Sequence, residues 1–314
     1  MCYKNMNKPA LLLSAAFCFS TLTDIAIADD GDKIKKVNCN NANASVQSTL
    51  DKVKVGRDTT IFIEGFCDEH VSIVKDGITL SGDRDGNGVV GGGLTEITIT
   101  GAQRVQIEYL DISGAGSGVG VGEGASATIR NNNIHDNDAD GVGVYYNAFA
   151  RLESNMITRN GQREDEEAGI QVYQGGTVRS SGNYVADNGY AAVEAGSVTY
   201  FRSFGGDRLL QKGCSENALP GEGNSCGEPG TVAVDCYRSG VCDFRDTHVI
   251  GNIDITSLSN FDIRNSTVNG DIYGGGGSRV HVRPGVTGSG TVNCDSTAIA
   301  QGAVPCFGSL PPTP

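Results

Sequence analysis

Residues 132–144 read NNIHDNDADGVGV, residues 155–172 read NMITRNGQREDEEAGIQV, and residues 183–193 read NYVADNGYAAV. Each segment opens with Asn-x-Ile/Val-x-x-Asn and continues through a Gly or Ala to apolar residues spaced two apart. The opening asparagines are 23 and 28 residues apart. Self-similarity at such a period is typical of a solenoid, in which each repeat forms one coil that stacks on the next. The repeat therefore predicts an all-β solenoid.

The first 28 residues have the pattern of a secretory signal peptide. Lys4 and Lys8 form a basic start, residues 11–20 a short apolar core, and residues 26–28 an Ala-x-Ala cleavage site. The apolar run is too short to cross a bilayer, so we expect no membrane span. This pattern predicts an exported protein that is periplasmic, extracellular or held at the cell surface.

The composition narrows the choice of partners. The chain has 24 Lys and Arg against 37 Asp and Glu, a net charge of −13. A surface that binds nucleic acid or another polyanion normally needs a basic patch, and this balance argues against such a patch and against a nucleic-acid partner. The 45 glycines and the absence of tryptophan suit repeated tight turns better than a large aromatic core.

Eight cysteines remain once the signal peptide is removed, and an even number in an exported protein indicates disulfides. Spacing alone leaves the pairing open. Because a solenoid brings sequence neighbours together, we expect the sequential set Cys39–Cys67, Cys214–Cys226, Cys236–Cys242 and Cys294–Cys306.

Short β-branched runs begin at residue 60. Thr60-Ile61-Phe62-Ile63-Glu64-Gly65 is followed by Val71-Ser72-Ile73 and then by Asp76-Gly77-Ile78-Thr79-Leu80-Ser81-Gly82. These runs resemble the entry coils of the pectin lyase-like superfamily of right-handed parallel β-helix proteins, over about residues 44–294. The resemblance implies a single-stranded right-handed parallel β-helix. Val46, Leu50 and Val53 have helical spacing, and a short N-terminal helix there would cap the open end of the solenoid.

The chain then divides into a signal peptide (1–28), one β-helix domain (29–306) and a Pro-rich tail (307–314). Two insertions interrupt the coils, an acidic one at 161–167 and a cysteine-bearing one at 205–230. We expect a monomer.

Outward positions beside the repeat read Glu108, Arg130, Glu153 and Arg179 in successive coils. Alternating charges about 4.8 Å apart form an ion ladder that keeps the coils in register. The repeated asparagines are likewise interpreted as structural, because their amides can pass hydrogen bonds from coil to coil.

The strand after the second asparagine is the candidate for function. With Val142, Val144, Ile170, Val172 and Val193 pointing inward, alternation predicts an outward column of Gly122, Tyr145, Tyr173 and Glu194. A neighbouring column would read Gly120, Gly143, Gln171 and Ala192. Small residues beside aromatic faces and a carboxylate suggest a groove for a glycan. The predicted substrate-binding residues are Tyr145, Tyr173, Gln171 and Gly143.

Acidic residues crowd the rim of this groove, and paired carboxylates are what glycoside hydrolysis requires. We predict Asp138, Asp140 and Glu194 as catalytic, with His135 as an auxiliary. Hydrolysis of a polysaccharide is the first expectation, and a lyase or epimerase reaction is the second. The alternative is a non-catalytic β-helix that serves as a cell-surface or matrix scaffold.

Asp83-Arg84-Asp85-Gly86-Asn87-Gly88 matches the first half of a calcium loop, with candidate ligands Asp83, Asp85 and Asn87. The twelfth position is Leu94 instead of Glu, which excludes a full EF-hand. Calcium is therefore an optional cofactor, and no cofactor is expected to be required.

Overall fold

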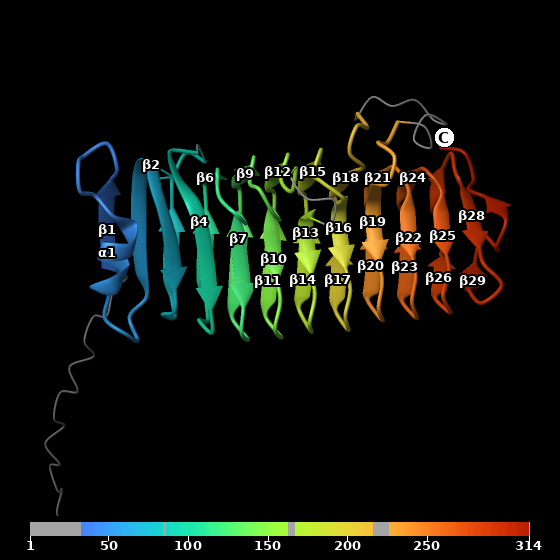
Figure 1. Cartoon of the computed structure of the whole chain (residues 1–314), viewed down its shortest axis with the longest axis horizontal. Helices are drawn as coiled ribbons and strands as arrows, with labels where there is room; N and C mark the ends of the chain where they lie inside the picture. Colours follow the sequence, from blue (N-terminus) through green and yellow to red (C-terminus); the bar gives the residue numbers. More distant parts are fainter. Residues whose placement is uncertain (1–32, 84–85, 89, 163–166, 216–225, 314) are drawn as a thin grey trace, which may run out of the picture. The chain divides into compact units, whose positions relative to one another are not determined.

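The computed structural model describes residues 33–83, 86–88, 90–162, 167–215 and 226–313. Its strands form three stacks in which each strand pairs in parallel with its equivalent in the next coil. Figure 1 shows successive coils side by side, in sequence order from blue to red. The all-β solenoid expected from the repeat is confirmed, with about 11 turns.

The first stack contains β1 (Lys33–Asn38), the start of β2 (Thr59–Ile73), β3 (Ile78–Ser81), β5 (Val105–Glu108), β8 (Ser126–Arg130), β11 (Phe149–Glu153), β14 (Thr177–Ser181), β17 (Tyr200–Ser203), β20 (Val241–Arg245), β23 (Asn260–Arg264), β26 (Arg279–Val282) and β29 (Ile299–Gly302). The second stack contains the middle of β2, the start of β4 (Gly92–Thr100), β6 (Leu110–Ser113), β9 (Asn133–His135), β12 (Met156–Thr158), β15 (Tyr184–Ala186), β18 (Arg208–Leu210), β21 (His248–Ile250), β24 (Thr267–Asn269) and β27 (Thr287–Gly288). The third stack contains the ends of β2 and β4, then β7 (Val119–Gly122), β10 (Val142–Val144), β13 (Ala168–Val172), β16 (Ala191–Ala195), β19 (Val232–Cys236), β22 (Ile253–Ile255), β25 (Ile272–Gly274) and β28 (Thr291–Cys294).

The core lies inside the coils and consists mainly of Val, Ile and Leu side chains. Alternation along each strand sends one residue inward and the next to the surface. From β17 onward the core is filled by Phe201, Phe244 and Phe261, whose ring centroids follow each other at 5.5 Å. Phe244 and Phe261 lie in the coils after residue 232, which are shorter than the coils before it.

The asparagines form two buried ladders, as the sequence predicts. Asn132 donates to Asn155 Oδ1 at 3.0 Å, and Asn155 donates to Asn183 Oδ1 at 2.9 Å. The second ladder runs from Asn137 through Asn160 to Asn188 by the same kind of bond. Each amide also donates to a backbone carbonyl one coil away, so the ladders satisfy buried corner groups that would otherwise lack partners.

The corner before the first ladder uses one residue with positive φ per coil. Tyr109, Asn131, Ser154 and Asp246 have φ between 49° and 55°. This shared corner explains why the inward residues on its two sides, such as Ile129 and Ile134, stand five positions apart in the sequence.

The ion ladder is only partly as predicted. Glu108, Arg130 and Glu153 are register neighbours, and Arg130 pairs with Glu108 at 2.6 Å. Arg179, however, lies beside Arg151, because β14 aligns Val178 with Ala150 and not with Leu152. The fourth member of the predicted ladder was therefore wrong by two residues.

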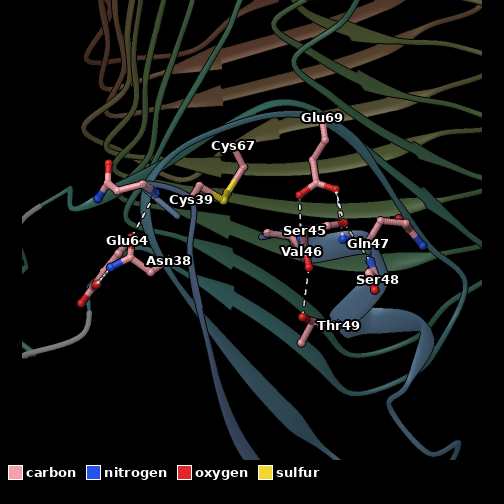
Figure 2. Close-up of a disulfide and its surroundings, with 11 residues drawn as sticks. Asn38, Cys39, Ser45, Val46, Gln47, Ser48, Thr49, Glu64, Cys67 and Glu69 are labelled. Carbon is pink, nitrogen blue, oxygen red and sulfur yellow. Dashed lines mark hydrogen bonds between the residues drawn. A yellow bond between two sulfur atoms is a disulfide. The ribbon is translucent and has the colours of Figure 1, made fainter. Parts of the chain in front are cut away.

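The N-terminal end is capped by the helix α1 (Val46–Asp51), shorter than the predicted segment. Figure 2 shows Glu69 at the start of α1, where its carboxylate accepts hydrogen bonds from Ser45 Oγ and from the backbone N–H groups of Val46 and Gln47. The adjacent Cys39–Cys67 disulfide joins β1 to β2 (Figure 2). Because both sulfurs are bonded to each other, this cluster of Cys39, Cys67 and Glu69 is not a metal site.

All four predicted disulfides are present: Cys39–Cys67, Cys214–Cys226, Cys236–Cys242 and Cys294–Cys306. At the C-terminal end, β30 (Gly308–Ser309) pairs antiparallel with β28, and Leu310 is buried. The first residues of the segment assigned to a tail thus pack against the last coil. Within the described residues, no helix has the length and apolarity to cross a membrane.

Candidate functional site

The outward face of the third stack carries the candidate site, but its columns differ from those predicted. Gln171 aligns with Glu194, and Glu194 aligns with Asp235. The prediction that Glu194 continues the column of Tyr145 and Tyr173 was wrong, because Val193 pairs with Ile170 and not with Val172. A shift of two residues keeps the inward and outward alternation, so alternation alone could not detect it.

The corrected columns separate aromatic from acidic residues. One column reads Gly120, Gly143, Gln171, Glu194, Asp235 and Asp254. The tyrosine positions follow at the next outward step, where Tyr145 and Tyr173 stack with ring centroids 5.3 Å apart. Tyr145 and Tyr173 thus lie beside Gly143 and Gln171, and the acidic residues of the first column begin one coil later, at Glu194.

Glycines make room for these rings. A Cβ at Gly122 would lie 2.5 Å from the ring of Tyr145, and a Cβ at Gly196 would lie 2.3 Å from the ring of Tyr237. The ring of Tyr145 therefore occupies the small-residue floor that the sequence suggested would be open. A Cβ at Gly143 would lie 3.5 Å from the ring of Tyr145 and 3.8 Å from Asp140 Oδ2, so Gly143 lies next to both side chains.

A pocket of about 540 Å³ opens over the acidic column, lined by Glu167, Gln171, Tyr190, Glu194, Asp235, Tyr237 and Arg238. We call it the carboxylate groove. Glu194, 8 % exposed, accepts a hydrogen bond from Gln171 Nε2 at 2.9 Å, and the Tyr237 hydroxyl also bonds it. Asp235 accepts a hydrogen bond from the Tyr190 hydroxyl at 3.0 Å. Each of the two carboxyls is thus held in place by a tyrosine.

The groove raises the pKa values of its own groups. Burial raises the pKa of Asp235 to about 6, the charges of Glu194 and Asp254 add to the rise, and the Tyr190 hydrogen bond opposes it. Burial also raises the pKa of Asp254 and of the Tyr190 and Tyr237 hydroxyls. A carboxyl with a pKa of about 6 keeps its proton over a wider pH range and can act as a general acid.

Asp140, a predicted catalytic residue, lies beside this groove and is almost fully buried. Burial, the charge of Glu167 and a hydrogen bond between the two side chains raise the pKa of Asp140 well above its usual range. Its Oδ1 also accepts the backbone N–H of Ala168 at 2.9 Å. This contact anchors the start of β13, which indicates a positioning role for Asp140.

The other predicted catalytic residues lie elsewhere. His135 is on β9 in the second stack, where Nδ1 contacts Asp136 at 2.6 Å and Nε2 contacts Asp111 at 3.2 Å. Asp138 lies in the turn that follows and does not line the groove. Their predicted place near Glu194 rested only on their position in the repeat.

The calcium loop is described in part. Asp83 Oδ1 and Oδ2 accept the backbone N–H groups of Asn87 and Gly88 at 3.1 and 2.7 Å. Asp85 lies outside the described residues. The Asp83 carboxylate thus accepts hydrogen bonds from the turn backbone, and calcium binding stays a proposal.

Sequence reasoning placed Glu194 and Gln171 on this face but missed Tyr190 and the part of the groove contributed by β19 and the turn after it, which carry Asp235, Tyr237 and Arg238. Val-Ala-Val-Asp at 232–235 repeats the Ala-Ala-Val-Glu of 191–194, which is the signal that could have located Asp235. The intervening insertion broke the period and hid this equivalence.

Comparison with known proteins agrees with the β-helix fold. The family described as "Right handed beta helix region" matches residues 70–203. A solved structure of ORF18 of Geobacillus virus E2 is 15 % identical with a TM-score of 0.59, over 86 % of this chain. The crystal structure of pectate lyase Pel9A is 14 % identical with a TM-score of 0.54, over 87 % of this chain and 80 % of the enzyme.

The chain spans 61 % of the viral protein. No curated protein sequence matches it. The repeats, the three strand stacks and these likenesses together define its fold, a right-handed parallel β-helix similar to that of pectate lyase Pel9A.

Proposed function

We propose that this chain is an exported protein that binds a neutral polysaccharide in the carboxylate groove and hydrolyses it. The observation that carries the proposal is the pair formed by Glu194 and Asp235. They are register neighbours in one pocket, and a tyrosine hydroxyl bonds each of them. Two carboxyls in different environments are the basis of acid and base assignment in glycoside hydrolysis.

Asp235 is the general acid in this proposal, since its pKa of about 6 lets it hold a proton for the leaving oxygen. Glu194 is the nucleophile or base, oriented by Gln171 and Tyr237. The backbones of register neighbours in adjacent coils are about 4.8 Å apart, which allows their carboxyls to approach the roughly 5 Å separation that retaining hydrolysis uses. This spacing supports a retaining mechanism.

The charge of the groove favours a neutral substrate. Among the residues that the structure describes, Glu167, Glu194 and Asp235 line the groove and Arg238 is the one cation in its lining. A polyuronate would meet like charges there. Tyrosine rings beside the carboxyls offer apolar faces to sugar rings. Lyase or epimerase chemistry on a uronate, the second expectation from the sequence, has less support from this arrangement.

The fold and the disulfides add support of a more general kind. Pectate lyase Pel9A has a similar fold, although a likeness of 14 % identity carries no specific activity. Four disulfides are typical of proteins that work outside the reducing cytosol, which supports export.

The test is an activity screen of the chain without residues 1–28 on neutral and acidic polysaccharides, with reducing ends and unsaturated uronates measured. We expect reducing ends from a neutral polymer, and a loss of at least about 100-fold in Glu194→Gln and in Asp235→Asn. Glu153→Gln, on the first stack, is the matched control and should keep full activity. A parallel arm with chelator tests calcium.

A non-catalytic glycan-binding scaffold is the alternative. It is favoured by the internal hydrogen bonds of Glu194 and Asp235, which already satisfy part of each carboxyl. Saturable glycan binding without new reducing ends or unsaturated uronates would select it. Absence of both binding and cleavage on every polymer would reject both functions.

A further inference from the structure

The outward face of the first stack is basic, although the chain as a whole is acidic. Seven described arginines lie on it between β11 and the corner after β26, in the set Arg151, Arg179, Arg202, Arg245, Arg264, Arg279 and Arg283. We call this set the arginine face. The net charge of −13 predicts no basic patch, and the structure corrects that expectation.

The register of these arginines is not that of a ladder that holds coils together. Arg151 pairs with Arg179, and Arg179 pairs with Arg202. Arg245 likewise pairs with Arg264. Like charges directly opposite each other in a sheet are destabilising, so stability alone would not select these rows.

One buried carboxylate, Asp243, follows Arg202 in the first row and lies beside the second row. Asp243 lies 2.9 Å from Arg202 Nε, 3.1 Å from an Arg245 nitrogen and 3.8 Å from an Arg264 nitrogen. Each guanidinium carries five N–H donors, whereas a carboxylate offers about four lone-pair sites. Asp243 therefore leaves most of these donors to solvent or to another anion.

The next coil shows the same excess of cationic hydrogen-bond donors over carboxylate acceptors. Arg283 donates to both oxygens of Asp262, and His281 Nδ1 lies 3.4 Å from Asp262 Oδ2. Arg279 stands exposed beside them. Among the described residues, no carboxylate lies within ion-pair distance of Arg179 or Arg279. These two cations are free to meet a partner.

The arginine face is hollowed as well as charged. A pocket of about 430 Å³ spans it from Tyr200 to Gln301, lined by Arg202, Arg245, Arg264, Arg279 and Arg283 among others. At its end the exposed ring of Phe204 lies within 5.4 to 5.9 Å of three guanidinium carbons, those of Arg179, Arg202 and Arg245. The stacked ring holds the guanidinium groups in place and lowers the entropy lost when they bind an anion.

We propose that the arginine face is a second binding site, which holds an acidic polysaccharide bearing carboxylate or sulfate groups. Rows of arginines that recur at the coil spacing suit an anion that repeats along a polymer. A duplex nucleic acid carries a charge about every 1.7 Å and would meet the long-range repulsion of a chain with net charge −13. The arginine rows recur at the coil spacing of about 4.8 Å, which is wider than the charge spacing of a duplex.

This site is separate from the carboxylate groove, since the first and third stacks are different faces of each coil. The acidic polymer would anchor the protein to a matrix while the groove remains open. The proposal does not depend on catalysis, because binding here should survive Glu194→Gln.

The test measures binding of fluorescent dextran sulfate to the chain without residues 1–28, in chelator so that no metal bridges the polymer to the groove. We expect saturable binding that weakens with salt. Arg179→Gln with Arg279→Gln should weaken it by at least about 5-fold. Lys52→Gln with Lys54→Gln removes the same charge from exposed positions near α1 and should change affinity less than 2-fold.

Unlabelled dextran and duplex DNA of equal mass concentration are the competitors. Equal loss in the two double variants would overturn the proposal, and so would no binding or preferential displacement by DNA. Should the arginine variant fail to fold, wild-type protein can be modified with phenylglyoxal and mapped by mass spectrometry. Dextran sulfate should then protect Arg179 and Arg279 and leave Arg159, on the second stack, unprotected; uniform protection would contradict the site.

Discussion

Asp235→Asn should stabilise the protein at pH 7, because burying the ionised Asp235 carboxylate in the groove lowers the free energy of unfolding. Burial and the charges of Glu194 and Asp254 disfavour its ionised form. Since the folded-state pKa exceeds the unfolded-state value, the cost is absent below about pH 3.8 and fully present above about pH 6. Stability contributed by this group therefore falls as pH rises through that window.

The pKa gives the size of the effect. A rise from 3.8 to about 6 corresponds to about 3 kcal/mol when the carboxyl is fully ionised. Asparagine keeps an oxygen that can accept the Tyr190 hydrogen bond but carries no charge. Relaxation of Glu194 and water entry reduce the gain, so we expect about 1 to 2 kcal/mol at pH 7 and almost none at pH 4.

The assay is denaturant unfolding of wild type and variant at pH 4 and pH 7. Asp262→Asn is the matched control with the opposite sign. Burial alone would raise the pKa of Asp262, but the hydrogen bonds and charge of Arg283 lower it, so its removal should destabilise the protein at pH 7. If Asp235→Asn destabilises at pH 7, or gains equally at both pH values, the account of the groove as a site of strained carboxyls is refuted.

Three further substitutions test the scaffold. Asn155→Ala removes an amide that donates to Ile129 O and Asn183 Oδ1, and the free energy of unfolding should fall by about 2 to 4 kcal/mol in denaturant titrations. Ser154→Gly relieves a positive φ of 54° and should raise that free energy by up to about 1 kcal/mol; a loss would show that the corner is unstrained. Glu69→Ala removes the acceptor at the start of α1, so amide hydrogen exchange at Val46 and Gln47 should accelerate while coils beyond β4 stay protected.

Sequence reasoning reached the fold because its signals are local. The asparagines of each ladder recur once in each coil, and each disulfide joins cysteines that are close in the sequence. Both features follow from coil stacking, which relates each residue mainly to its neighbours one coil away.

The site was harder because it depends on register between coils. A strand slipped by two residues shows the same alternation, and this is how Arg179 and Glu194 were assigned to the wrong columns. Successive coils of 23 and 28 residues differ in the length of their turns, so the spacing in the sequence does not give the strand register. The pairing of Val193 with Ile170 in the structure shows which outward residues are neighbours. Asp235 was missed for the same reason, since an insertion separates its strand from the previous coil.

The most direct test of the carboxylate groove is a crystal structure of the Glu194→Gln variant soaked with oligosaccharides of the neutral polymer that the activity screen selects. The account predicts sugar density across Gln171, Asp235, Tyr190 and Tyr237, with a glycosidic oxygen within hydrogen-bond distance of Asp235. Density at any other face, with the groove empty under saturating ligand, would contradict it.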